Sequence, residues 1–265
     1  MARTRIATIV AVIATAVGVT VAAAPASAAT TVVTEISPTS TFTPGATRDT
    51  GTVAIGTTFG APAGFGTGSL ELSTPASNDK AQAVSTQAAG TLLSTFATRI
   101  GYATYRSSAS TASPLQYPAL NVEVDLNGAA AGGYTTLVYE PYYTVGSAAL
   151  KLDTWQTWDA AQGRWWTTRP AAPFTATFGA DTRLWSDVLA ANPDAVIISV
   201  GINQGSGNAG LIAAADALVA GGLTIDFDPR VYTKDDCKAG GWQTNFPAGK
   251  YKNQGDCVSS FATTR

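Results

Sequence analysis

Histidine is absent from all 265 residues of the chain. Without an imidazole, the chain cannot build a Ser-His-Asp or Cys-His catalytic arrangement, a histidine general base or a histidine-ligated zinc site. Cysteine is nearly absent as well, with Cys237 and Cys257 as the two copies, both near the C-terminus. A metal site there would lack further ligands, whereas two thiols in an oxidising compartment pair. We therefore expect a disulfide that closes a loop of about 20 residues and contributes about 3 kcal/mol in the chain-entropy model.

Charged residues are also scarce, at 13% of the chain, with a formal net charge of −2. Residues 1–28 contain two arginines and no acid, so the remainder carries 14 − 18 = −4. No basic surface is expected, which argues against nucleic acid and against an anionic membrane as partners. The glycines of GINQGSGNAG lack the spacing and the strand–helix setting of a nucleotide site, so residues 205–208 are interpreted as an exposed loop.

The first 28 residues have the pattern of a secretory signal peptide. Arg3 and Arg5 precede an uncharged apolar run over residues 6–24, and Ala26-Ser27-Ala28 forms a small-x-small cleavage site. A membrane anchor is the alternative, because the run is nearly long enough to span a bilayer. We expect a secreted, extracellular protein whose mature chain begins at residue 29.

Alternation of apolar and polar residues dominates the rest of the chain. Over residues 120–126, Leu, Val, Val and Leu alternate with Asn, Glu and Asp, and Asn127-Gly128 marks a turn. Residues 194–207 contain a run that is apolar on both strand faces, which is typical of a central strand. One short helix is expected over residues 181–193, capped by Asp181 or Thr182 and stopped by Pro193. Strands separated by turns predict an all-β domain over residues 29–228, a jelly-roll-type β-sandwich with one short helix.

Residues 229–265 have a different composition, richer in Gly, Lys, Asn and Gln. The two cysteines lie inside this segment. We expect a small disulfide-closed appendage, with Trp242 and Phe246 as its miniature core, because so short a segment has little else to bury.

Four of the six tryptophans lie in one stretch, TWQTWDAAQGRWWTT, residues 154–168. If it forms a hairpin that turns at residues 161–163, Trp155 and Trp158 face opposite ways, and so do the adjacent Trp165 and Trp166. About two indoles would be buried and two accessible. Accessible indoles stack on the apolar face of a sugar ring; the alternative is that all four are packed. The candidate ligand contacts are Trp158, Trp165, Tyr142 and Arg164.

Acidic residues offer two further kinds of site. Glu123 and Asp125 share a strand face and Glu140 lies on another strand; paired carboxylates hydrolyse glycosides, but we interpret these acids as solvated and expect no catalytic residue. Carboxylate and amide oxygens also bind calcium, although no EF-hand loop is present. No cofactor is expected, and a structural calcium ion is left open with these candidate ligands: Asp125, Asn127, Asp216, Asp226 and Asp228.

The chain resembles a group of secreted actinobacterial proteins over roughly residues 66–260. The resemblance is carried by YTTLVYEPYY, TWQTWDA, LAANPDAVIISVGINQGSGNAG and DDCKAGGW…YKNQGDCVSSF. Those proteins have a laminin-G or carbohydrate-binding-module-like jelly roll and a cysteine-bounded tail. The resemblance implies a two-sheet β fold outside the cell, and no family catalytic residues map onto this chain.

These observations predict a non-catalytic binding protein for an extracellular polysaccharide or glycoconjugate, acting as a monomer. One alternative is a structural extracellular or cell-envelope protein without a ligand. Another is a glycan hydrolase or lyase that uses paired carboxylates. A toxin or inhibitor acting through the lysines of the tail loop is a further alternative, with these residues: Lys234, Lys238, Lys250 and Lys252.

Overall fold

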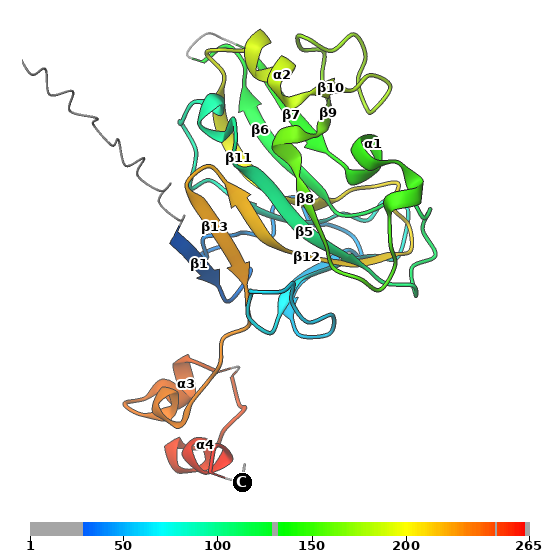
Figure 1. Ribbon diagram of the computed structural model, residues 1–265. Helices are drawn as coiled ribbons and strands as arrows, with labels where there is room; N and C mark the ends of the chain where they lie inside the picture. The colour runs from blue at the N-terminus through cyan, green and yellow to red at the C-terminus, as the bar shows by residue number, and fades with distance from the viewer. Residues whose placement is uncertain (1–28, 129–131, 247, 263–265) are drawn as a thin grey trace, which may run out of the picture.

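Two β-sheets pack face to face in a computed structural model that describes residues 29–128, 132–246 and 248–262. The signal peptide expected for residues 1–28 lies outside the described residues. Figure 1 shows the two layers, with a small helical lobe below them that follows the last strand. None of the described helices has the length and apolar content that a membrane crossing requires.

The six-stranded sheet is antiparallel throughout. Its β11 lies between β6 and β4, so the expected inner position of this strand is confirmed. In order across the sheet, the strands are β10 (Arg183–Leu184), β9 (Arg164–Thr167), β7 (Tyr134–Tyr139), β6 (Ala119–Asp125), β11 (Val196–Gln204) and β4 (Ala81–Ser85).

The seven-stranded sheet is built around β12 (Leu211–Ala220). On one edge β12 pairs with β5 (Ile100–Arg106), which pairs with β8 (Gln156–Asp159). On its other edge, β12 pairs with both β13 (Leu223–Phe227) and β3 (Ser69–Thr74). β13 also pairs with the parallel strand β1 (Ala29–Val33), and β3 also pairs with β2 (Thr52–Gly56).

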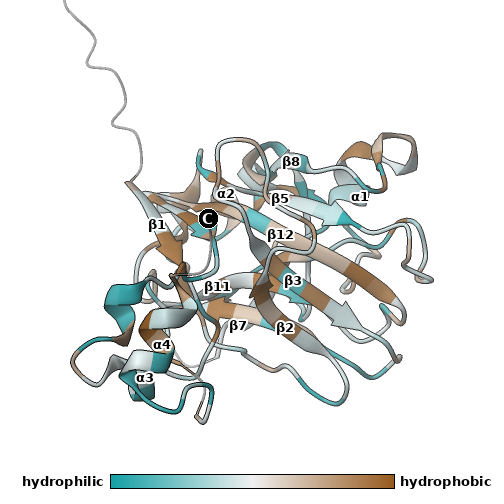
Figure 2. Ribbon diagram, turned by 90° about the horizontal axis from the view of Figure 1, so that it is seen from below, coloured by the Kyte–Doolittle hydropathy of each residue, from teal (hydrophilic) through white to brown (hydrophobic). Residues whose placement is uncertain are grey.

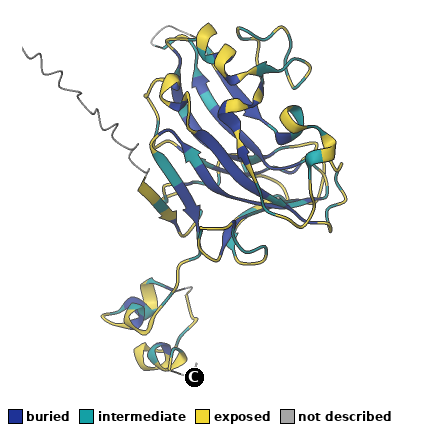
Figure 3. Cartoon of the chain, in the orientation of Figure 1, coloured by how far each residue is buried: buried dark blue, intermediate teal, exposed yellow. Residues whose placement is uncertain are grey.

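The core lies between the sheets and follows the predicted alternation. Along β6, Leu120, Val122 and Val124 are fully buried, while Asn121 and Glu123 point to the opposite face. Figure 3 shows buried residues concentrated in the strands of both layers, and Figure 2 shows apolar segments in the same strands. A period of two therefore fixes which side chains fill the core and which reach the outer surface.

The helices of the sandwich are short. They are η1 (Leu93–Phe96), α1 (Pro141–Val145), η2 (Ser147–Ala149), η3 (Ala160–Gln162) and α2 (Trp185–Ala191). The expected helix is present as α2, but the predicted cap is wrong: the N-cap is Leu184, without a side-chain hydrogen bond. Asp181 and Thr182 precede β10 and bond elsewhere. The sequence reasoning missed α1, which is a single turn begun by Pro141.

The predicted tryptophan hairpin is wrong, because its two strands lie in different sheets. β8 pairs with β5 in one sheet, β9 pairs with β7 in the other, and η3 carries the chain between them. The crossing is possible because Ala160 and Ala161 are small enough to be buried there. Adjacent Trp165 and Trp166 nevertheless face opposite ways: Trp165 is 0% exposed and Trp166 is half-buried on the outer face.

The tail forms a separate small core closed by the predicted Cys237–Cys257 disulfide, which is confirmed. Its helices are η4 (Lys234–Cys237), α3 (Gly241–Thr244) and α4 (Gln254–Ser260). Phe246 is buried in one cluster with the two cysteines, and Trp242 packs half-buried against this cluster, as expected. Tyr232 and Tyr251 add ring contacts to Phe246.

Trp165 and Trp166 form a natural pair for testing the core assignment. The Trp165 ring lies 4.5 Å from that of Trp185, and its indole nitrogen donates to the carbonyl of Ala160. Trp165→Ala is expected to lower the free energy of unfolding by about 3–5 kcal/mol, as for other buried aromatics. Trp166→Ala, on the outer face, should cost about 1 kcal/mol. Urea unfolding of both variants measures the difference, and equal costs would contradict the assignment.

Asp216 predicts an unusual pH dependence of stability. It is fully buried on β12, and its Oδ1 accepts hydrogen bonds from the N–H groups of Ala217 and Phe227. Burial, with a smaller effect of Asp226 and Asp228, raises its pKa from 3.8 to about 7. The unfolded chain ionises this group near pH 4, so between about pH 4 and 7 the folded state holds a proton that the unfolded state lacks. Stability contributed by this proton is lost as the pH rises through that window.

Asp216→Asn keeps an acceptor for both N–H groups and removes the charge. We expect it to stabilise the protein above pH 7 by a few kcal/mol, since one pKa unit corresponds to about 1.4 kcal/mol, and to change little at pH 4. Urea unfolding at both pH values, in buffer with a chelator, measures this. The exposed Asp194→Asn is the control, and a gain that does not depend on pH would overturn the explanation.

Candidate functional site

A groove of about 520 Å³ runs over the outer face of the six-stranded sheet. The side chains on its floor alternate with core residues along β6, β7 and β9. Along β6 they are Asn121 and Glu123, the polar partners in the alternation that predicts this strand. The strand residues of this groove, including Glu140 and Thr168 just beyond β7 and β9, are Gln82, Ala119, Asn121, Glu123, Tyr134, Thr136, Val138, Glu140, Trp166, Thr168 and Asn203.

An aromatic wall forms one side of the groove. The Trp166 ring lies 6.1 Å from the ring of Phe178, whose side chain is 69% exposed. The Trp166 indole nitrogen donates to Oε2 of Glu140 at 3.0 Å, which fixes the orientation of the ring. Val138 lies beside Trp166 in the β7–β9 register. A rigid indole next to an accessible phenyl ring offers flat apolar surface to a ligand.

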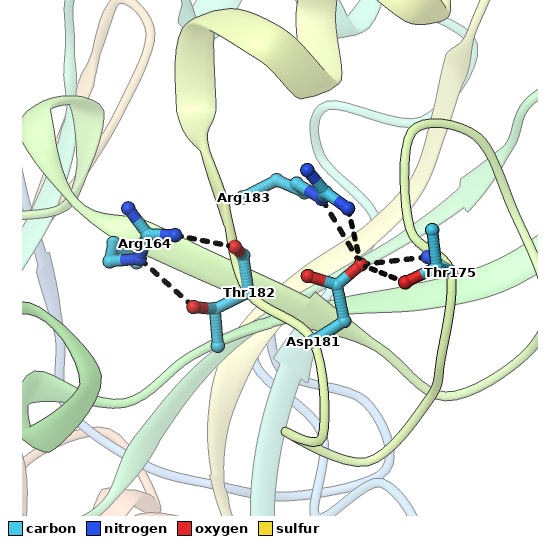
Figure 4. Close-up of polar contacts among 5 residues, drawn as sticks. All are labelled: Arg164, Thr175, Asp181, Thr182 and Arg183. Carbon is cyan, nitrogen blue, oxygen red and sulfur yellow. Dashed lines mark hydrogen bonds and ion pairs between the residues drawn. The ribbon is translucent and has the colours of Figure 1, made fainter.

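The loop that carries Phe178 is held at both sides by hydrogen bonds (Figure 4). Oδ2 of Asp181 accepts from the backbone and hydroxyl of Thr175, at 2.7 and 2.9 Å, and from the guanidinium of Arg183. The Thr175 N–H is the main reason that the pKa of Asp181 is lowered. The N–H of Phe178 donates to the carbonyl of Thr167, at the end of β9. The loop therefore presents Phe178 from a fixed position.

The floor contains buried amide groups with unused hydrogen-bonding capacity. Asn121 is only 8% exposed, and among the described residues its Oδ1 has no hydrogen-bond partner. Oδ1 of Asn203 is likewise buried and without a partner in the described part of the chain. A buried polar atom left in this state costs about 1–3 kcal/mol, which a donor supplied by a ligand recovers. These two amides are the strongest sign that the groove binds a polar molecule.

Charged side chains occupy defined places in the groove. Glu123 accepts hydrogen bonds from Ser199 at 2.8 Å and from the Tyr134 hydroxyl at 3.3 Å. Burial raises the pKa of Glu140, and the hydrogen bond from Trp166 opposes this in part. Lys80, at the β4 side, has its pKa lowered, first by burial and then by Arg48. The groove thus combines carboxylates on its floor with two cations at one side.

The spacing of Glu123 and Glu140 bears on hydrolysis. Glu123 is opposite Thr136 in the β6–β7 register, four residues before Glu140. At about 3.3 Å per residue along the strand and about 5 Å between strands, the Cα atoms of the two glutamates lie about 14 Å apart. In glycosidases the two carboxyl groups flank one bond, about 5–10 Å apart. Here Glu123 accepts hydrogen bonds from Ser199 and Tyr134, whereas Glu140 accepts one from Trp166. Asp125 is opposite Tyr134, still further from Glu140 along the sheet.

Two of the four predicted ligand contacts are wrong. Trp158 is 7% exposed and donates to Oγ1 of Thr104 at 2.8 Å, and Trp165 is fully buried. Both point between the sheets because the chain crosses layers at η3. Tyr142 is half-buried on α1 and stands against Tyr143, outside the groove.

Arg164 is exposed, but its guanidinium donates to the hydroxyl and the carbonyl of Thr182, at 2.9 and 2.7 Å (Figure 4). It therefore supports the segment before β10 and does not line the groove.

Sequence reasoning missed the residues that form the groove. The alternation places Asn121 and Glu123 on one face of their strand, which is the outer face in the structure, but nothing in the pattern indicates a groove there. Trp166 would follow from the alternation once Trp165 is known to be buried. Phe178, Arg48 and Lys80 come from loops or strand ends without a recognisable pattern.

The five calcium candidates do not form one site. Asp125 accepts from the N–H of Asn127 at the end of β6, in the six-stranded sheet. The other three aspartates lie on or next to β12 and β13, in the seven-stranded sheet. Within the described ranges, no group of three or more His, Cys, Asp or Glu side chains is placed to hold a metal ion.

Comparisons with known proteins add nothing to this geometry. No family model matches the chain, and neither a curated protein nor a solved structure matches it. The resemblance to secreted actinobacterial jelly rolls therefore stays a prediction, and the function is inferred from the groove itself.

Proposed function

We propose that this protein binds a polysaccharide or glycoconjugate, without catalysis, in the groove over the six-stranded sheet. The observation that carries the proposal is the buried amide oxygen of Asn121, which has no hydrogen-bond partner among the described residues. It shares the groove with the aromatic wall of Trp166 and Phe178, with Val138 between Asn121 and Trp166 in the register. A sugar ring has an apolar face of C–H groups and a rim of hydroxyls. The apolar face of the sugar would stack on the aromatic wall, and its hydroxyls would donate hydrogen bonds to the amide oxygens of the floor.

The shape of the groove also supports an extended ligand. Its volume of about 520 Å³ lies in the usual range for ligand sites, and its lining residues extend from β4 across β11, β6 and β7 to β9. A chain of sugars could therefore contact several strands at once. For one such site we expect a dissociation constant between millimolar and micromolar, about 4–8 kcal/mol.

The two alternatives predicted from the sequence receive less support. A structural protein without a ligand has no need for a groove in which two buried amide oxygens lack partners among the described residues. A hydrolase with paired carboxylates needs two acids that flank one bond, whereas Glu123 and Glu140 are engaged by different neighbours, Glu123 by Ser199 and Tyr134 and Glu140 by Trp166.

Further parts of the proposal concern the setting of the protein. The sandwich is proposed to be of the jelly-roll type, and the mature chain to be a secreted monomer released from a signal peptide over residues 1–28. The disulfide in the tail supports this setting, because disulfides persist in oxidising compartments.

Retention of the protein on a panel of insoluble and gel-embedded polysaccharides tests the proposal. Trp166→Ala and Asn121→Ala are each expected to weaken retention at least about tenfold, which corresponds to about 1.4 kcal/mol. Trp155→Ala is the matched control: this half-buried indole lies outside the groove, near the Tyr105 ring, and donates to the carbonyl of Phe59. The control should bind as the unaltered protein does. If the panel retains nothing, or if Trp155→Ala weakens retention as much as Trp166→Ala, the groove is not the binding site.

A further inference from the structure

Two cations stand next to each other at the β4 side of the groove. Arg48 and Lys80 form an antiparallel β-bridge, in which the Arg48 N–H donates to the Lys80 carbonyl at 3.0 Å. Side chains opposite each other in such a pair have Cβ atoms about 4.5–5.5 Å apart, and like charges in this arrangement repel. Both side chains line the groove. The fold thus holds two positively charged side chains next to each other, where their charges repel.

These cations have little compensation from the protein. Among the described residues, Lys80 takes part in no ion pair within 4.0 Å, although it is only half exposed. Arg48 has Asp49 at 3.9 Å, in a pair that is about half exposed, and its Nε donates to the carbonyl of Asn78. Glu123 on the groove floor favours the charged form of Lys80, but from beyond ion-pair distance. An anionic group from outside the chain would relieve the repulsion.

Amide groups extend from the cations along the floor. Gln82 is on the same face of β4 as Lys80, two residues further, and is opposite Asn203 in the β4–β11 register. Gln82 is 4% exposed, and its Oε1 is occupied by the N–H of Ala46. Ammonium, guanidinium and amide groups are the donors that recognise a carboxylate or a sulfate among hydroxyls. The cations thus lie at the side of the floor where the amides of Gln82 and Asn203 follow them along β4 and β11.

We infer that the groove selects an acidic polysaccharide, and that the anionic group of one sugar residue, a carboxylate or a sulfate ester, lies against Arg48 and Lys80. The inference deepens the proposed function and rests on it. Attraction by the protein as a whole does not explain such binding, because the formal net charge of the chain is −2. Retention of a polyanion by a protein of negative net charge requires a local cationic site.

Affinity electrophoresis in gels that contain one polysaccharide each tests the inference. The arms are polygalacturonate and alginate for carboxylates, dextran sulfate for sulfate esters, and dextran and soluble β-glucan as neutral chains. The protein should be retarded by at least one acidic polymer at least about tenfold more strongly than by the neutral ones. Added sodium chloride should weaken this retardation, since the charges are partly exposed.

Variants separate the cationic site from the rest of the groove. Lys80→Gln and Arg48→Gln should each reduce retardation by the acidic polymer at least about fivefold, while Lys80→Arg, which keeps the charge, should retain it. Lys151→Gln, an exposed lysine outside the groove, is the matched control and should leave retardation unchanged. Urea unfolding midpoints show that the variants are folded.

The outcomes distinguish this inference from the proposed function. If neutral polymers retard the protein and acidic ones do not, the inference is overturned while the polysaccharide-binding function stands. If Lys151→Gln weakens retardation as much as Lys80→Gln, the effect is one of overall charge and the inference also fails. If no polymer of either kind retards the protein, the proposed function itself is wrong.

Discussion

The two-residue period of the six-stranded sheet is the constraint on which the rest of the structure depends. The floor side chains of β6 and β9 have strand neighbours that are sealed in the core: Asn121 lies between Leu120 and Val122, and Trp166 lies between Trp165 and Thr167. A shift of one residue in register would exchange the two faces. The core that holds the sheets together therefore also fixes the direction of every floor side chain, so the groove is formed before any ligand arrives.

The aromatic wall depends on a second level of order, because Phe178 is in a loop and not on a strand. The carboxylate of Asp181 gathers the loop by binding Thr175 and Arg183, and Arg164 binds the segment beside it. The conformational entropy of this loop is therefore already lost on folding, so less of it would be lost when a ligand binds. Arg164 is expected from the sequence to contact the ligand. In the structure its guanidinium binds Thr182 and supports the segment next to the aromatic wall.

Much of the fold could be predicted from the sequence, and the reason is local. Three predictions depend on short stretches of sequence alone. They are the strand over residues 120–126, the central strand before residue 204 and the cysteine pair. The choice of buried indoles could not be predicted in the same way, since it depends on β8 and β9 joining different sheets. Likewise, Lys80 and Arg48 are 32 residues apart in the chain and become neighbours only through a bridge that no local pattern encodes. The alternation of residues predicts which side chains share one face of a strand. Pairing between distant segments determines which of these faces come together.

The residues of the groove are, taken singly, unfavourable to folding. Asn121 buries an amide oxygen that receives no hydrogen bond from the described part of the chain, Lys80 holds a charge that burial and Arg48 both disfavour, and Phe178 leaves a phenyl ring in water. Packing in the core, such as the contact between Trp165 and Trp185, offsets such costs. Each unfavourable group would gain from the same kind of molecule, one that donates hydrogen bonds, carries negative charge and presents an apolar face. The proposed acidic sugar chain would satisfy all three groups with one ligand.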